Sequence, residues 1–520
     1  MGRIINPATN KPFVEVQPST EIIKLREQIT SVIRAKYDAA QTTSQNELHW
    51  INADHLSPNA ANTLAIRQKL RSRARYESAN SGYLKGILLS LANDFTGGGP
   101  KLQITDRRFT QEQRFILEQL YATRATRIKL RQKLWQMRYA RSDSGEAFGV
   151  YYADRKSKLK VKSNFRTIEC DQFTHSDYFV NNQQEIDGIH FNPSSGEPDR
   201  YHLLNDHPGE TELFTLRPYD GRWIAAENVI HWFRKERAWL RGIPETTATL
   251  PLWALLRRYT LAVVQNAEIA ADFTVLLKSM QIPATNPFTG NLDTASQQSP
   301  QDWFDSFPVD RGLMTVLPSM YDMEQLDPKQ PVNMYDTFVN SLVQEAARPL
   351  CVPRNMALGY SGGYNMASGT LDRQVYAGTI QQDRYGCNED ILSKDMDQWW
   401  YEAVRIDGYL DDDLATPSRI QDVVNRFSSL REIPPEHVFR WDEIQEHTDP
   451  VKVAHAINLL HIAGHLSDTD IQEGKFNRSV ETHYENLARQ QAKRKELEMV
   501  VGNKQSQDEP ASINEDGEDN

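Results

Sequence analysis

Residues 228–244 read N-V-I-H-W-F-R-K-E-R-A-W-L-R-G-I-P, and residues 251–273 read P-L-W-A-L-L-R-R-Y-T-L-A-V-V-Q-N-A-E-I-A-A-D-F. The apolar run 229–233 is typical of a short β-strand. A basic loop (234–241) and a Gly-Ile-Pro turn follow it, and the second segment predicts a long helix over residues 251–278. Because that helix is apolar over much of its circumference, we expect it to be buried between neighbouring structures.

The composition indicates a mixed α/β protein. At 520 residues the chain has room for about three or four domain-sized units. No apolar run approaches the roughly 20 residues of a transmembrane helix, and the first ten residues lack a signal-peptide pattern. We therefore expect a chain made in the cytosol, without membrane insertion.

Its three cysteines, Cys170, Cys351 and Cys387, are widely spaced, which excludes a disulfide framework and a zinc ribbon. We expect no metal and no cofactor.

The net charge of −11 is unevenly distributed. Residues 502–520 hold six acids (Asp508, Glu509, Glu515, Asp516, Glu518 and Asp519) against one cation, Lys504. The rest of the chain is only mildly acidic, which argues against an ordinary protein that grips nucleic acid over its whole surface. It does not argue against a channel, in which tight phosphate contacts would impede movement of DNA.

Helical and β-type segments alternate in blocks along the chain. Segments with a helical pattern are 20–40, 63–92, 111–138, 251–278, 334–348, 370–406, 450–463 and 467–499. Residues 147–233 are β-rich, with runs such as A-F-G-V-Y-Y and R-Y-H-L-L between turn residues. Residues 281–330 form a polar, proline-punctuated insertion, and residues 351–369 form a glycine-rich loop.

Three patterns have possible chemical meanings. The run 359–363, G-Y-S-G-G, fits the G-x-S-x-G nucleophile elbow with Ser361, but that elbow needs a preceding strand and the residues before it carry Pro349 and Pro353. His461 and His465 have the i, i+4 spacing of a metal pair on one helix face, although ordinary surface histidines fit as well. The basic run 124–138 is typical of a solvated helix face, with contacts to another subunit's acids or to DNA as the alternatives.

Several patches, in order over residues 60–500, resemble phage portal proteins of the lambda family. The strongest is 231–244, within the stretch quoted first. Others are the helix 71–86 with the glycine turn 97–99, the Gly-Glu-Ala-Phe segment 145–148, the β-segments 168–171 and 188–191, and the closing patches 448–456 and 483–490. One departure is the run 364–373, Y-N-M-A-S-G-T-L-D-R, where the family has a Tyr-Ser-Ser-x-x-Arg-like sequence. The end of the glycine-rich loop is therefore not fixed by the resemblance.

The resemblance implies an α+β portal fold that assembles as a ring. Its parts would be an α/β wing, a helical stem, a small clip, a tunnel loop and a helical crown. By range these are an N-terminal arm (1–61), the wing (62–249), the stem helices (250–278 and 331–349), the clip (279–330), the tunnel loop (351–369), the long wing helix and wing remainder (370–449), the crown (450–500) and an acidic disordered tail (501–520).

The same resemblance suggests positions for three kinds of contact. Asn355, Tyr360, Ser361, Asn365 and Met366 would face the DNA channel. Asp302, Trp303 and Asp305 would belong to the clip that docks the terminase and later the neck. For Arg234, Arg237 and Arg241 we expect ion pairs at the subunit interface, or within the wing, rather than phosphate binding.

The implied function is that of a non-enzymatic ring of about twelve subunits around a DNA channel at one capsid vertex. It would nucleate procapsid assembly with the major capsid and scaffolding proteins, in the host cytoplasm, and remain in the virion. It would dock the terminase large subunit, pass double-stranded DNA, and join the neck and head-completion proteins. No Walker A sequence is present, so the packaging ATPase would be a partner. The alternatives are a serine hydrolase using Ser361, and a head-tail joining or DNA-binding protein that forms no ring.

Overall fold

The structure is a computed structural model of the full chain. It describes residues 47–175, 184–210, 220–238, 240–272, 276–279, 321–324, 335–363, 365–411, 419–442, 444, 450–466, 468, 471 and 480–496. Within these residues, no helix combines the length and hydrophobicity that a membrane-spanning segment requires.

Five helices open the described chain: α2 (Pro58–Ala61), α3 (Leu64–Asn80), α4 (Gly82–Thr96), α5 (Gln111–Arg127) and α6 (Leu130–Ser144). The two long helices predicted here are each broken in two. Ser81 has extended backbone and caps α4 by accepting from the amide of Leu84. Lys129 takes a left-handed conformation (φ 56°) between α5 and α6. Each break ends one helix and begins the next.

The β-rich region predicted from residue 147 onward is confirmed. One antiparallel sheet has the order β3-β2-β8, and a second has the order β4-β5-β6-β7. Their strands are β2 (Glu146–Ala153), β3 (Ser163–Ile168), β4 (Glu185–Ile186), β5 (Ile189–Phe191), β6 (Pro198–Leu204), β7 (Gly221–Ala225) and β8 (Val229–Phe233). A separate two-stranded sheet joins β1 (Lys101–Ile104) to β11 (His437–Arg440), which are distant in the sequence. Short 3₁₀ turns lie at Cys170–Gln172, Ala226–Asn228 and Thr247–Thr249.

Two glycines allow the backbones of the G-E-A-F segment (145–148) and the G-I-P turn (242–244) to lie in direct contact. Gly145 has φ +90°, and a Cβ there would lie 2.3 Å from the carbonyl carbon of Ile243. A Cβ on Gly242 would lie 2.2 Å from the carbonyl oxygen of Gly145. Real Cβ contacts are never so short, so the turn from α6 into β2 and the turn after β8 can meet only through glycine.

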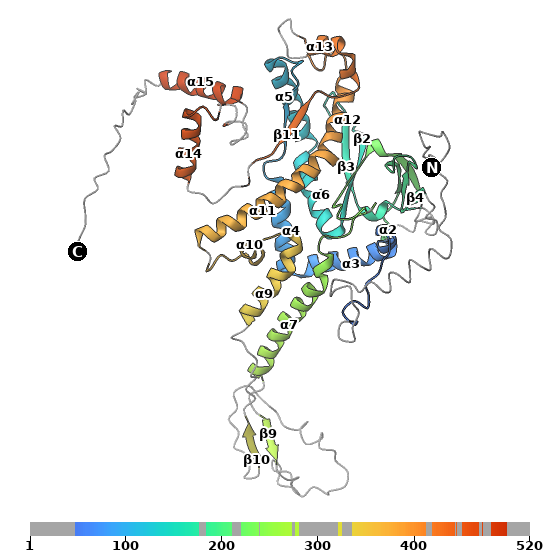
Figure 1. The fold of residues 1–520 in the computed structure, drawn as a ribbon, viewed down its shortest axis with the longest axis vertical. Helices are drawn as coiled ribbons and strands as arrows, with labels where there is room; N and C mark the ends of the chain where they lie inside the picture. Colours follow the sequence, from blue (N-terminus) through green and yellow to red (C-terminus); the bar gives the residue numbers. More distant parts are fainter. Residues whose placement is uncertain are drawn as a thin grey trace, which may run out of the picture.

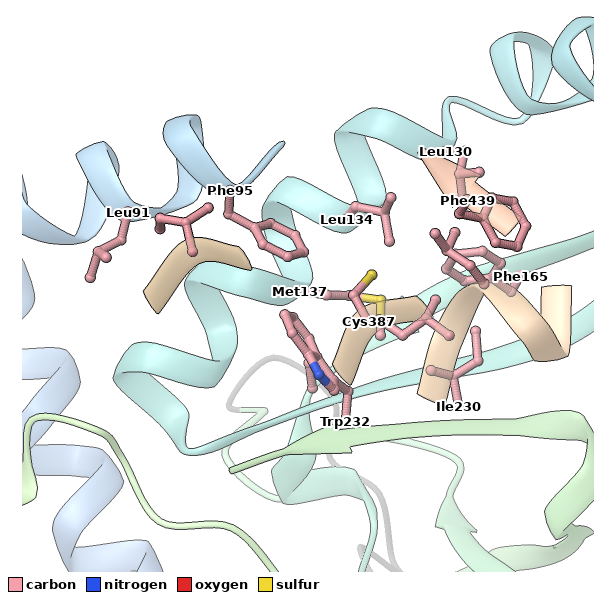
Figure 2. Close-up of a cluster of buried hydrophobic side chains, with 14 of the residues drawn as sticks. Leu91, Phe95, Leu130, Leu134, Met137, Phe165, Ile230, Trp232, Cys387 and Phe439 are labelled. Atoms are coloured by element: carbon pink, nitrogen blue, oxygen red, sulfur yellow. The ribbon is translucent and has the colours of Figure 1, made fainter. Parts of the chain in front are cut away.

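The main core lies between the β3-β2-β8 sheet and helices α4, α6 and α11 (Figure 2). Trp232 of β8 is buried against Phe95 of α4, with ring centroids 5.4 Å apart. Met137 of α6 and Cys387 of α11 are buried in the same cluster. Each large apolar side chain removed from water in this way contributes about 2–3 kcal/mol. The strand 229–233 quoted first is thus the one around which the core is built.

The predicted long helix after this strand is α7 (Leu250–Asp272), which ends before the predicted residue 278. It packs beside α9 (Tyr335–Ala347), and Figure 1 shows the pair leading away from the body toward a small hairpin. That antiparallel hairpin consists of β9 (Leu276–Ser279) and β10 (Tyr321–Glu324). Strand β9 therefore occupies the last residues of the predicted helix.

The remaining helices are α10 (Arg354–Leu358), α11 (Met366–Cys387), α12 (Ser393–Ala403), α13 (Ile420–Arg426), α14 (Pro450–Ile462) and α15 (Val480–Glu496). A π-helical turn, Asn388–Leu392, joins α11 to α12, and 3₁₀ turns lie at Arg348–Leu350 and Ser428–Arg431. The predicted helix 370–406 therefore begins four residues early, inside the predicted loop, and contains a turn that the sequence pattern did not indicate.

Candidate functional site

A short loop, residues 359–365, joins α10 to α11, and its described residues, 359–363 and 365, are exposed. Tyr360 is 68% exposed, and Ser361 is also exposed. Gly359 and Gly363 have φ of +63° and +80°, which L side chains rarely adopt. A Cβ on Gly362 would lie 2.1 Å from the Tyr360 hydroxyl, so the Tyr360 ring folds back over this glycine. The loop presents uncharged polar and aromatic groups.

The loop is shorter than the predicted 351–369, because helices occupy both of its ends. Asn355 lies half-buried in α10. Asn365 is the N-cap of α11, and its side chain accepts from the amide of Ser368 at 2.8 Å. Met366 is the first residue of α11. Of the five residues predicted together, only Tyr360, Ser361 and Asn365 lie in the exposed connection.

Ser361 is not in a nucleophile elbow. That arrangement requires a strand before the serine and a helix after it. The structure places helix α10 before Ser361, five residues long and ended by Gly359. The hydrolase alternative therefore lacks its structural basis.

Large apolar side chains are exposed on α11, which follows this loop, and on α7. On α11, Leu371 and Val375 are each 64% exposed, and their i, i+4 spacing puts them on one face. On α7, Leu261 is 55% exposed and Val264 is 51% exposed, whereas Trp253 is fully buried. The sequence predicted that α7 would be apolar over much of its circumference. The structure shows that a single chain covers one side only.

The three arginines after β8 have different surroundings. Arg241 is buried, and its guanidinium pairs with Glu146 at 2.6 Å, so it makes the intra-chain ion pair and is not on a surface that a neighbouring subunit could reach. Arg234 is 36% exposed and lies 3.7 Å from the carboxylate of Glu236. Arg237 is exposed, and its guanidinium donates to the carbonyl of Leu56 at 3.4 Å. Only Arg234 and Arg237 remain candidates for subunit contacts.

Glu146, the first residue of β2, is the centre of a buried ion-pair network. Arg241 donates to both of its carboxylate oxygens, with Nε at 3.0 Å from each. Arg71 of α3 pairs with the same carboxylate, and His231 Nε2 lies 2.9 Å from it. Arg241 also donates to the carbonyls of Phe173 and Asp187. One carboxylate thus connects α3, the first sheet and the loops beside the second sheet.

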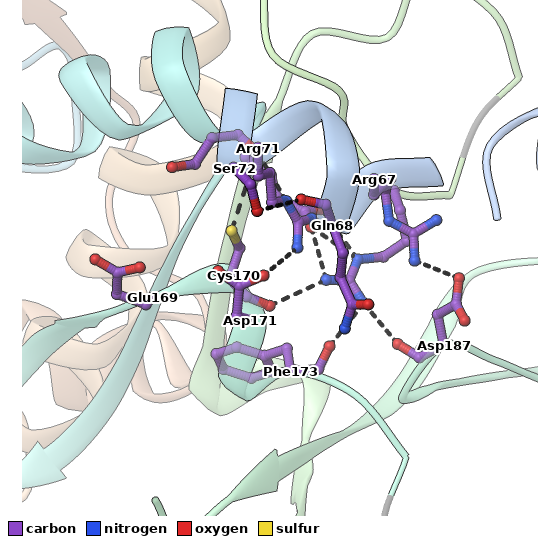
Figure 3. Close-up of polar contacts among 12 residues, drawn as sticks. Arg67, Gln68, Arg71, Ser72, Glu169, Cys170, Asp171, Phe173 and Asp187 are labelled. Carbon is purple, nitrogen blue, oxygen red and sulfur yellow. Dashed lines mark hydrogen bonds and ion pairs between the residues drawn. The ribbon is translucent and has the colours of Figure 1, made fainter. Parts of the chain in front are cut away.

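Figure 3 shows the side of this network that faces α3. Arg67 pairs with Asp187, and Arg71 donates to Asp171 at 3.0 Å. Asp187 has φ 49°, a left-handed conformation that Asp tolerates better than most residues. The arginines of α3 therefore hold the connections around the second sheet in place.

The network controls two ionisations. Burial opposes ionisation of Glu146, but Arg241 and Arg71 hold its pKa well below the ordinary value. Burial lowers the pKa of His231 to about 4, against the opposing hydrogen bond to Glu146. The imidazole is therefore neutral at pH 7, with its Nε2–H donating to Glu146 and Nδ1 3.3 Å from the Tyr201 hydroxyl.

The basic run 124–138 is not simply the solvated face predicted from the sequence. Arg124 is buried and makes two contacts with Asp395 of α12, at 2.7 and 3.0 Å. Arg138 is buried between Glu245 and Asp383, at 3.1 and 2.9 Å. Burial opposes ionisation of Glu245, but Arg138 and its neighbour Arg141 lower its pKa to about 2. Arg127 and Arg131 on the same stretch are exposed, as predicted.

Two groups of residues carry side chains that can bind a metal ion. Helix α14 ends at Ile462, so His461 and His465 do not share a helix face, and His461 Nδ1 lies 3.0 Å from the carbonyl of Leu466. Ligand atoms of Glu169, Asp171 and His207 lie within 4.8 Å of one another. However, the guanidinium of Arg75 already contacts both carboxylates, at 2.9 and 2.7 Å, and occupies the place of a cation.

The predicted docking residues Asp302, Trp303 and Asp305 lie outside the described residues.

The sequence did not lead us to predict two features that the structure shows. One is the set of buried arginines, whose acidic partners are too distant in the sequence for a local pattern to reveal them. The other is the exposed turn between β2 and β3, which a count of charges along residues 154–162 would have identified.

Comparisons with known proteins give one family. A family model described as phage portal protein, lambda family, matches residues 45–368. No curated protein sequence matches the chain. Solved structures with similar chains share little sequence. A chain in the neck of an empty GTA particle is 10% identical, over 77% of this chain and 91% of that chain, with a TM-score of 0.43. A chain in the virion of the native gene transfer agent (GTA) particle is 10% identical, over 83% and 98%, with a TM-score of 0.41. An HK97-family phage portal protein from Corynebacterium diphtheriae is 11% identical, over 65% and 93%, with a TM-score of 0.32.

Proposed function

Because the chain belongs to the lambda family of phage portal proteins, we propose that it closes into a ring of about twelve copies around a DNA channel at one capsid vertex. The ring nucleates procapsid assembly with the capsid and scaffolding proteins, admits the genome, retains it, and releases it through the neck and tail. The observation that carries this proposal is the family match over residues 45–368, which is more than half of the chain.

The exposed apolar faces support ring closure. A ring subunit needs two different surfaces that meet head to tail. Leu371 and Val375 on α11, and Leu261 and Val264 on α7, leave apolar surface on two separate helices of one chain. Contiguous exposed apolar surface is typical of interaction sites. We assign these faces to contacts between adjacent subunits.

We assign the remaining parts by the same logic. The body 62–249 with 370–449 is the wing, α7 and α9 are the stem, residues 279–330 are the clip, and 450–500 are the crown. The loop 359–365, with Tyr360, Ser361 and Asn365, is the part of the predicted tunnel loop that reaches the channel. Its uncharged groups suit transient contact with a moving duplex, because strong phosphate contacts would hold it.

The chain acts without catalysis of its own in this proposal. The terminase large subunit supplies the packaging energy and docks on the clip, and neck proteins take its place afterwards. Replacement of Asp302, Trp303 and Asp305 by alanine should leave the ring intact and reduce DNA packaging, measured as nuclease-protected genome per capsid.

Electron microscopy of the purified full-length chain tests the ring. Rings of about a dozen subunits with a central hole wide enough for duplex DNA are expected. The double variant Leu371→Glu/Val375→Glu should abolish them, because it puts two charges on a face that closure buries. A matched double variant, Ile433→Glu/Val438→Glu, changes two side chains that are 64% and 49% exposed elsewhere and should leave rings intact. Monomers or dimers at every salt concentration, also after co-expression with the capsid protein, would contradict the proposal and favour a joining or DNA-binding protein without a ring.

A further inference from the structure

The turn between β2 and β3 is the most basic short segment of the described chain. Residues 155–162 read R-K-S-K-L-K-V-K, with five cations in eight residues, in a protein of net charge −11. Its one nearby acid in sequence, Asp154, accepts from the backbone amide of Lys156 at 3.1 Å. The charge of this turn is therefore not neutralised by its own sequence.

The turn is held in a defined conformation. The amide of Asp154 donates to the carbonyl of Lys162 at 2.8 Å, and Lys162 Nζ donates to the carbonyl of Ser157 at 2.6 Å. The amides of Lys162 and Ser163 each donate to the carboxylate of Glu402 at 2.7 Å. The carboxylate of Glu402 is thus committed to the backbone of the turn. Ordering of the turn before binding reduces the entropy that a ligand contact would otherwise cost.

The apolar and basic side chains of the turn point to different sides. Val161 is 2% exposed and belongs to the main core. Arg155, Lys156 and Lys158 are exposed, and none of the three side chains makes an ion pair with any residue that the structure describes. The turn therefore offers a cluster of exposed cations. Such a surface recognises a repeated anion by charge rather than a particular peptide by shape.

The turn lies at the end of the body that is remote from the β9–β10 hairpin. Glu402, which anchors it, is next to the C-terminal end of α12, and Figure 1 shows that end of α12 far from α7, α9 and the β9–β10 hairpin. This step rests on the proposed function: if the clip faces outward to the motor, the turn faces the capsid interior. The polyanion on that side is the packaged genome.

We propose that the turn 155–162 is a contact site for the phosphate backbone of double-stranded DNA on the interior face of the ring. The site is separate from the channel and independent of DNA sequence. Each subunit contributes one such turn, so the ring carries a circle of cations against which the innermost DNA lies.

The test uses purified full-length rings and covalently closed circular duplex DNA, which has no end to enter the channel. The variant Arg155→Gln/Lys158→Gln is compared with Lys69→Gln/Arg73→Gln, which removes one exposed lysine and one exposed arginine from α3. Each phosphate contact contributes about 0.9 to the slope of log affinity against log salt concentration. The first variant removes two cations from every turn, so it should lower this slope by about 2 for each turn that contacts the DNA. For a single contacting turn, the ratio of wild-type to variant affinity falls about tenfold between 50 and 200 mM salt, and it falls further when several turns of the ring contact the same DNA. The control variant should keep the wild-type slope.

The outcomes separate this inference from the ring proposal. Rings with an unchanged slope in Arg155→Gln/Lys158→Gln would overturn the DNA contact and leave the ring proposal standing. If the wild-type protein forms no rings, but the variant still has a lower salt slope for DNA binding than the wild type, the phosphate contact is supported and the ring proposal is contradicted. If the variant instead loses binding of a peptide of residues 501–520 while its DNA slope is unchanged, the turn is a site for the acidic tail, and the DNA inference is wrong.

Discussion

Removal of the Asp395 carboxylate should lower the free energy of unfolding of the protein. Asp395 is fully buried in α12, and it accepts from Arg124 at 2.7 and 3.0 Å and from the Tyr121 hydroxyl at 2.8 Å. The variant Asp395→Leu leaves the guanidinium of Arg124 buried without a counter-ion. Loss of one partner of a buried ion pair costs about 3–5 kcal/mol.

The surroundings place the expected cost near the lower end of that range. Arg124 keeps two contacts with the carbonyl of Ser163, at 3.1 and 3.3 Å, which partly satisfy it after the carboxylate is gone. The Tyr121 hydroxyl loses its acceptor, at about 1 kcal/mol or more. We therefore expect a loss of about 3–4 kcal/mol in the free energy of unfolding. In Arg124→Met/Asp395→Leu the orphaned charge is absent, and most of this loss should be recovered.

Urea unfolding followed by tryptophan fluorescence measures the change in the free energy of unfolding. Trp399 is buried beside Tyr121, with ring centroids 5.4 Å apart, and it is one of the ten tryptophans that contribute to the signal. Protein concentration is held constant, because subunit association adds to apparent stability. The reasoning is refuted if Asp395→Leu costs less than about 1 kcal/mol, or if the double variant is no more stable than the single one.

Two other predictions concern single residues, in addition to the ring and DNA-binding variants above. The folded pKa of His231, about 4, lies below its ordinary value of 6.5, so the unfolded chain binds more protons between these pH values, and the free energy of unfolding should fall as the pH drops through this window. The contribution is at most about 3 kcal/mol, and a pH series of urea unfolding should show a shallower fall for His231→Phe; equal slopes would contradict it. Gly145→Ala should cost about 2 kcal/mol or more in the same assay, because it combines φ +90° with a backbone clash at Ile243. Gly86→Ala is the control: its Cβ meets nothing within 4 Å, and a normal yield and stability are expected there.

The local elements could be predicted where their patterns are self-contained. The strand 229–233 and the helix that begins at Leu250 were predicted from apolar periodicity, and the structure confirms both. The break at Ser81 was missed although it lies in the run Asn80-Ser81-Gly82, because the apolar periodicity continues on both sides of it. The break at Lys129 was missed because good helix formers such as Arg127 and Leu130 flank it. Lys129 adopts a left-handed backbone at the junction of α5 and α6, which its residue type does not predict.

The buried charges could not be predicted for the same kind of reason. Arg124 and Asp395 are 271 residues apart in the sequence, and Arg67 and Asp187 are 120 apart. A helix with arginines at intervals has the same local pattern whether they meet water or a distant carboxylate. The basic run was therefore interpreted as a solvated face, and the arginine that seemed to suit a subunit contact, Arg241, is instead buried beside Glu146.

Two features of this chain are unusual for a monomer. Several arginines are buried beside the apolar core, and the large apolar side chains Leu371 and Val375 remain exposed. Buried ion pairs contribute little net stability, but they are costly to misplace, so they favour one arrangement of the helices and sheets. The exposed apolar faces lower the free energy only when something covers them. On the proposed function, the body is fixed before assembly, and the free energy gained on assembly comes from the faces that one chain leaves open. A subunit built in this way can meet its neighbours at one constant angle, which is the condition for a ring to close.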